Sequence, residues 1–183
     1  VQKGKCLYCR KPIRTFYFIN ELLHLLLMSL MIWIGLFSTF LELIIFFIVI
    51  SSLYAQFIID FKHLLLSVYL STKILILGLI LNSYSGFFSD IQSAFTGAFL
   101  GYFSLYVINK IYFYAHKREG IGGGDFILLA SIGALFGYQI LSIVVLIGSL
   151  ISLLVYFFKR PHYQGKVPLG SGLALSSLLI IFL

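Results

Sequence analysis

The sequence predicts an all-α membrane protein with about seven transmembrane helices. Of its 183 residues, 61% are hydrophobic and only 10% are charged, whereas a soluble domain is about half apolar and about a quarter charged. Seven apolar segments reach or approach the roughly 20 residues that a helix needs to cross a bilayer. Runs of this length favour helices over strands, because a helix satisfies its own backbone polar groups inside lipid.

The seven segments follow one another through short connections, after a basic N-terminal stretch. The fifth and the last are shorter than a full span, and the fifth and sixth are separated only near Gly137-Tyr138-Gln139. We therefore expect one transmembrane domain, residues 16–183, preceded by a short cytosolic segment, residues 1–15. The segments are 16–36, 38–59, 64–82, 90–114, 124–138, 139–158 and 168–183.

Basic residues lie at alternate connections. Of the 13 Lys and Arg residues, all but Lys73 precede the first segment or lie around the connections after the second, fourth and sixth. The positive-inside rule then places the N-terminus in the cytosol and the C-terminus on the outer side. This distribution explains the net charge of +7 without a nucleic-acid partner. Lys73 lies within the third segment, where we expect it to snorkel or to pair with an acidic group.

Two aspartates are predicted to lie on the cytosolic side. Asp60 ends the second segment, and Asp125 begins the fifth, directly after the stretch Gly-Ile-Gly-Gly-Gly at 120–124. Taken alone, Asp125 is explained as a helix cap and Asp60 as a partner of Lys62. The glycine-rich stretch lacks the Lys-Ser/Thr of a phosphate-binding loop. Asp90 falls on the opposite side, where we expect it to cap the fourth helix, with Ser89 as the alternative cap.

A pair of aspartates is suited to hydrolysing a peptide bond. One carboxylate takes a proton from water while the other, protonated, polarises the scissile carbonyl, and two carboxyl groups in one site do not both ionise easily. Gly122 and Gly124 allow a positive φ or the close approach of another chain. We expect them to bring a substrate strand within reach of Asp125.

A transporter or channel subunit is the alternative from another class. In that case Asp60 and Asp125 would relay protons or bind cations. That function predicts activity that depends on a gradient and no peptide cleavage. It also predicts more polar residues across the centres of the helices than this sequence has.

Four stretches of the sequence carry a resemblance to a known family. Residues 119–137, with Gly-Gly-Gly-Asp at 122–125, resemble the G-x-G-D region of the type IV prepilin peptidases, which are intramembrane aspartic proteases. Residues 60–67 resemble the region of that family's first catalytic aspartate, including His63. Residues 167–174 are similar to its P-x-G tail, and Cys6-x-x-Cys9 followed by Glu21 is similar to its second cysteine pair. Ser67 stands where the family usually has proline, and Ile127 where it often has lysine.

The resemblance implies a function and a location. Residues 16–183 would form an aspartic peptidase domain in a bacterial plasma membrane, and Asp60 and Asp125 would be its catalytic pair, working without a metal. The substrate would be a prepilin or pseudopilin whose leader is removed at the cytosolic membrane edge. A preflagellin-type peptidase with the same pair is the alternative within the proteases.

The resemblance also bears on cofactors. It implies a further helix and an earlier C-x-x-C before Val1, and four such cysteines bind zinc in many bacterial members. Cys6 and Cys9 are then half of a structural zinc site, or free thiols. Many members also methylate the processed pilin with S-adenosylmethionine. Most of the cytosolic segment tied to methylation is not found in residues 1–15, so this cofactor is expected only if methylation is retained.

Overall fold

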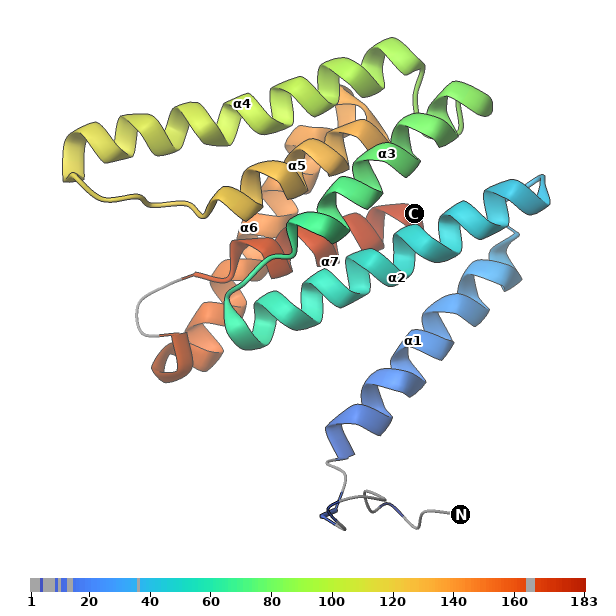
Figure 1. The fold of residues 1–183 in the computed structure, drawn as a ribbon, viewed down its shortest axis with the longest axis horizontal. Coiled ribbons are helices and arrows are strands. Elements are labelled where there is room, and N and C mark those ends of the chain that lie inside the picture. The colour runs from blue at the N-terminus through green and yellow to red at the C-terminus, as the bar shows by residue number, and fades with distance from the viewer. Residues whose placement is uncertain (1–3, 5–8, 10, 13–14, 36, 164–166) are drawn as a thin grey trace. The chain divides into compact units, whose positions relative to one another are not determined.

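The computed structural model describes residues 4, 9, 11–12, 15–35, 37–163 and 167–183, with no account of the side chains of 159–163. Its elements are helices, which confirms the predicted all-α class (Figure 1). The helices are α1 (Thr15–Ile34), α2 (Phe40–His63), α3 (Val68–Tyr84), α4 (Ile91–His116), α5 (Gly123–Phe136), α6 (Tyr138–Tyr163) and α7 (Leu169–Ile181).

The predicted segments match these helices closely, and the largest differences are at the start of α3, which begins at Val68 rather than at residue 64, and at two C-terminal ends. The second helix was predicted to end at residue 59, but α2 continues to His63, so Asp60 lies inside its last turn. The sixth was predicted to end at residue 158, and α6 continues to Tyr163. In both cases the helix extends past the apolar run into basic sequence. Cations are favourable at a helix C-terminus, which explains why the charges do not end the helix.

The chain divides into two compact units, residues 1–38 and residues 39–183. The first unit contains α1, whose 20 residues are long and apolar enough to cross a membrane. In the second unit α2, α4 and the stretch Tyr138–Phe158 of α6 also meet this criterion. The chain is therefore a polytopic membrane protein. The remaining helices α3, α5 and α7 are apolar but have only 17, 14 and 13 residues.

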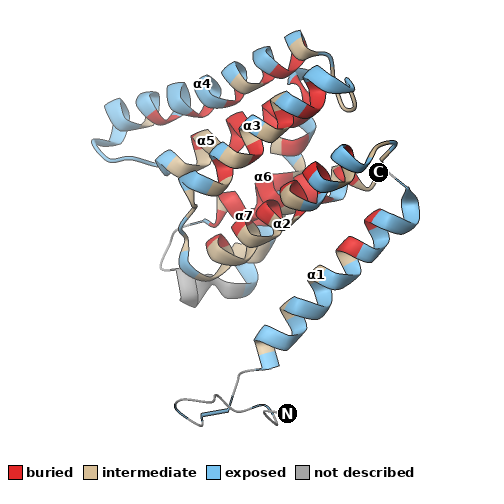
Figure 2. Ribbon diagram, turned by 45° about the vertical axis from the view of Figure 1, so that its right-hand side comes forward, coloured by how far each residue is buried: buried red, intermediate tan, exposed pale blue. Residues whose placement is uncertain are grey.

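Helix α5 is the central helix of the second unit. It contacts α3, α4, α6 and α7, and all its residues from Phe126 to Phe136 are buried except Ile127. Figure 2 shows the buried residues gathered on α5 and on the sides of its neighbours that face it. A helix that is apolar on all sides is stable only when it is enclosed in this way.

Glycines allow the helices around α5 to approach closely. The Cα positions of Gly97 in α4 and Gly133 in α5 lie against each other's backbone, so that a Cβ on either would overlap the other helix. One turn further along α4, a Cβ on Gly101 would lie 2.5 Å from the carbonyl oxygen of Leu129. Small residues at such crossings are the usual means by which membrane helices gain packing energy, because burial from lipid supplies little.

Asn82 fixes the end of α5 that is remote from Asp125. Its Nδ2 donates to the carbonyl oxygens of Ala134 and Leu135 at 2.9 and 2.8 Å. Its Oδ1 accepts from the backbone N–H groups of Phe88 and Ser89, both at 3.3 Å. One buried side chain thus satisfies carbonyls at the C-terminus of α5, which lack partners within the helix, and orders the α3–α4 connection.

Asp90 is the N-cap of α4, as predicted. Its Oδ2 accepts from the backbone N–H of Ser93 at 3.1 Å. This capping bond stabilises the start of α4 at the same end of the unit as Asn82.

We predict that Gly133→Val lowers the stability of the folded chain. The added atoms would meet the backbone of Gly97 in α4, which cannot move aside as a side chain could. Overpacking of this kind costs about 1–3 kcal/mol. The measurement is thermal unfolding in detergent.

Gly123→Ala is the matched control, because a Cβ there has nothing within 4 Å and alanine is the better helix former. We expect its unfolding temperature to be unchanged or slightly raised. Equal stability of Gly133→Val and the unmodified chain would contradict the close crossing of α4 and α5.

Candidate active site

Asp60 lies in the last turn of α2 and is buried. Its Oδ2 accepts a hydrogen bond from the backbone N–H of Ser171, the third residue of α7. A negative charge at the C-terminus of its own helix is unfavourable, whereas the N-terminus of another helix attracts it. The start of α7 therefore offsets the unfavourable position of Asp60 on α2.

Asp125 lies in the first turn of α5, where its backbone N–H donates to the carbonyl oxygen of Gly122 at 3.0 Å. Its Oδ1 is buried and has no hydrogen-bond partner among the described residues. The carboxyl group of Asp60 is close enough to act on Asp125 electrostatically. The structure thus brings together the two acids on which the sequence analysis rests, although they lie 65 residues apart in the chain.

Leu66 lies against the starts of both α5 and α7. A Cβ on Gly124 would be 2.8 Å from the Cβ of Leu66, and a Cβ on Gly170 would be 2.6 Å from its Cδ1. Leu66 belongs to the connection between α2 and α3, three residues after α2 ends at His63. One apolar side chain therefore contacts the two helix starts whose backbones carry Asp125 and the Ser171 N–H.

Asn109 holds the glycine-rich stretch before Asp125. This buried residue of α4 accepts, through Oδ1, from the backbone N–H groups of Gly120 and Ile121 at 2.9 and 3.0 Å. The stretch is therefore ordered at its beginning by a side chain from another helix.

Of the two uses considered for Gly122 and Gly124, a positive φ and a close approach, the structure does not show the positive φ. Gly122 has a φ of −71°, and the positive-φ glycines of the described residues are at other positions. Instead, the absence of a side chain at these two glycines allows neighbouring groups to pack closely against them. Gly124 packs on Leu66, and a Cβ on Gly122 would come within 3.3 Å of Oδ2 of Asp125. The role of both glycines toward a substrate stays a prediction.

Comparison with known proteins decides the family. Residues 47–157 match the profile of the type IV leader peptidase family. The chain belongs to this family. The matched range runs from the middle of α2 to near the end of α6 and includes both aspartates.

Several relatives are similar over most of this chain. A prepilin leader peptidase/N-methyltransferase of Stutzerimonas stutzeri is 32% identical over 178 residues, which cover 95% of this chain and 61% of the relative. One of Vibrio cholerae is 30% identical and is matched over 98% of this chain and 70% of its own length. One of Pectobacterium carotovorum is 40% identical over 113 residues, 62% of this chain and 40% of that protein. The chain thus spans about three fifths of the first of these relatives. No solved structure matches it.

Ser67, which stands where type IV prepilin peptidases usually have proline, has a structural role here. Its backbone N–H donates to Oε1 of Gln56 at 3.0 Å, a bond that proline could not form. In return, Nε2 of Gln56 donates to the carbonyl oxygen of Ser67 at 2.8 Å and to Oγ of Ser71 at 2.7 Å. Gln56 and Ser67 together hold the connection that carries Leu66.

The sequence analysis missed four residues of this site, namely Gln56, Leu66, Asn109 and Ser171. Gln56 and Asn109 had a signal, because an amide side chain inside an apolar helix needs a partner. Leu66 had no signal, because it is one apolar residue among many. Ser171 had none, because it contributes a backbone N–H, which every residue except proline has.

Of the two cysteines in the predicted zinc half-site, the structure describes only one. Cys6 lies outside them, and Cys9 is an exposed free thiol. A structural zinc ion needs four ligands, and the part of the chain that the structure describes holds no cluster of three His, Cys, Asp or Glu residues. Zinc binding by Cys6 and Cys9 stays a prediction.

We predict that Asn109→Ala loosens the stretch before Asp125. The variant removes the acceptor of two backbone N–H groups, and a lost hydrogen bond is worth about 1 kcal/mol. Amide hydrogen exchange across residues 118–125 should accelerate about fivefold. Asn82→Ala is the control, because it removes equivalent bonds at the other end of α5 and should leave exchange in 118–125 unchanged. Unchanged exchange in Asn109→Ala would contradict this role.

We also predict that Leu66 and Gly170 are energetically coupled. Gly170→Ala alone should destabilise the chain by about 1–3 kcal/mol, because its methyl group meets Leu66. The double variant Leu66→Ala/Gly170→Ala should cost less than the sum of its single variants, since the smaller side chain leaves room. The measurement is a double-mutant cycle of unfolding free energies. Leu66→Ala combined with Gly148→Ala, which lies against Leu173, is the additive control, and additivity in both cycles would refute the contact.

Proposed function

We propose that this chain is an aspartic endopeptidase that removes the leader peptide of type IV prepilin-like proteins. Three findings support the proposal: membership of the type IV leader peptidase family, the activity for which the similar proteins are named, and the proximity of Asp60 to Asp125. The carboxyl pair is the observation that carries it, because it supports the peptidase part of those names. The same findings favour a peptidase over a transporter.

The chemistry follows from the two carboxyl groups. One draws a proton from the attacking water, and the other, protonated, polarises the scissile carbonyl and later gives its proton to the leaving amine. Oδ2 of Asp60 is engaged by the Ser171 N–H. Oδ1 of Asp125 is buried without a partner in the described protein, and we assign it to the reacting groups. An acid and a base supply the proton transfers of hydrolysis, so the proposal assigns no step to a metal.

The location proposed for the reaction is the cytosolic edge of a bacterial plasma membrane. The end of α2 and the starts of α5 and α7 meet at one end of the second unit, whereas Asn82 joins α3, α5 and the α3–α4 connection at the other. This arrangement agrees with successive helices that run in opposite directions. The connections rich in Lys and Arg then lie at the end of the unit that carries the aspartates. A cytosolic N-terminus and an extracytoplasmic C-terminus follow from the positive-inside rule.

The test is cleavage of a prepilin by single Asp60→Asn and Asp125→Asn variants. Each substitution keeps the shape of the side chain and removes its acid–base function. We expect each to lower the rate of leader removal by about 10²–10⁴-fold. The measurement is the ratio of processed to unprocessed prepilin over time, with thermal unfolding of each variant measured alongside.

Asp90→Asn is the matched control. Asp90 caps α4 at the other end of the unit, and asparagine is also a good N-cap, so cleavage should stay within a fewfold of the unmodified chain. Processing at a near-normal rate by either Asp60→Asn or Asp125→Asn would refute the proposed pair.

A further inference from the structure

Lys73 is a cation inside the apolar helix α3, and the part of the chain that the structure describes gives it no acidic partner. It is the sixth residue of α3, about 7.5 Å along the helix axis from Val68. Its one contact with a charged or aromatic group in the described residues is with the ring of Tyr69, whose centroid lies 4.8 Å from Nζ. A cation–π contact stabilises a lysine only partly, and a charge at this depth is retained where a counter-charge is available.

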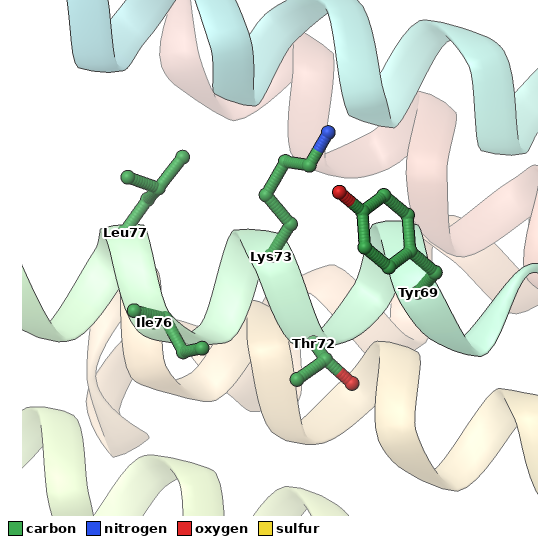
Figure 3. A pocket seen from close by; sticks show the side chains of 5 residues that line it. All are labelled: Tyr69, Thr72, Lys73, Ile76 and Leu77. Atoms are coloured by element: carbon green, nitrogen blue, oxygen red, sulfur yellow. The ribbon is translucent and has the colours of Figure 1, made fainter.

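Two pockets border Lys73. One, of about 250 Å³, is lined by Tyr69, Thr72, Lys73, Ile76 and Leu77. The other, of about 240 Å³, lies between α2 and α3 and is lined by Phe47, Ile48, Ser51, Ser52, Leu70 and Lys73. In Figure 3, Tyr69, Lys73 and Leu77 project from one side of α3, with the amine of Lys73 next to the tyrosine ring. The two pockets, here called the Lys73 groove, share this one positive charge and are otherwise lined by apolar side chains and several hydroxyl groups.

We propose that this groove binds an anionic phospholipid. The ammonium group of Lys73 binds the phosphate, and an acyl chain lies along the apolar residues of α2 and α3. The described residues place no acidic group beside Lys73, so charge complementarity favours an anionic ligand. The position near the end of α3 that carries Ser67 suits a headgroup, because lysine side chains reach toward the membrane interface.

The size of the pockets argues for a lipid rather than a peptide helix. A helix with its side chains is about 10–12 Å wide, and small-molecule sites measure about 300–1,000 Å³. Each pocket here is smaller than that range, which fits a segment of one acyl chain whose remaining length lies in the bilayer. The inference does not depend on the proposed peptidase activity, because neither aspartate lines the groove.

The test is lipid binding by the purified chain in detergent, measured by native mass spectrometry during titration with phosphatidylglycerol or phosphatidylcholine. We expect phosphatidylglycerol to bind more tightly. Lys73→Gln should weaken its binding about fivefold, since one basic residue contributes about 1 kcal/mol toward anionic lipid. Lys73→Arg should keep the binding. Leu77→Phe, which keeps the charge and narrows the pocket, should weaken the binding of both lipids.

Lys110→Gln is the matched control. Nζ of Lys110 lies 5.6 Å from the centroid of the Tyr106 ring, at the same sequence spacing, but Lys110 lines neither pocket. Its loss should leave lipid binding unchanged. Equal binding of the two lipids, or equal weakening by Lys73→Gln and Lys110→Gln, would overturn the proposal. So would unchanged lipid binding in Lys73→Gln together with weaker binding of a prepilin, which would identify a peptide as the occupant.

Discussion

The hydrogen bond from the Ser171 N–H to Asp60 joins the last turn of α2 to the first turn of α7. The carboxylate of Asp60 belongs to the C-terminus of α2, which is the negative end of that helix dipole. The bond places it at the N-terminus of α7, which is the positive end of another. Without the start of α7, a buried Asp60 would have neither donor nor favourable field. The geometry of the carboxyl pair therefore depends on a helix that begins more than a hundred residues after Asp60. Leu66, which contacts the starts of α5 and α7, holds the two together.

Amide side chains supply the remaining order around the site. Gln56 fixes the connection after α2, Asn109 fixes the stretch before α5, and Asn82 fixes the far end of α5. Each is buried and bonds to backbone groups, and Gln56 also donates to the side chain of Ser71. In a low-dielectric interior such bonds are strong, and losing one leaves two unsatisfied groups. A chain with few polar residues thus uses them to hold the connections that carry the carboxyl groups.

The sequence was informative where charge or polarity interrupts an apolar run. Asp60, Asp125 and Asp90 were placed at the correct ends of their helices for this reason, and the helix bounds followed from the lengths of the runs. The central position of α5 could not be predicted, because every helix of a membrane protein is apolar. The contacts of Leu66 could not be predicted either, since they depend on how α5 and α7 pack. The sequence left two uses open for Gly122 and Gly124, because a glycine can serve a positive φ or close packing and sequence alone does not separate the two.

The shortness of α5 has a consequence for the surrounding lipid. Its 14 residues extend about 21 Å, about 9 Å less than the hydrocarbon thickness that α2 and α4 are long enough to cross. At least one end of α5 therefore lies at the depth of acyl chains in an unperturbed bilayer. Hydrophobic mismatch of this kind thins the bilayer or draws water inward. Gly122 and Gly123 at the start of α5 are exposed, and if this end is the one that lies at acyl depth, its free backbone N–H groups need water or a polar peptide segment as partners, because lipid offers none.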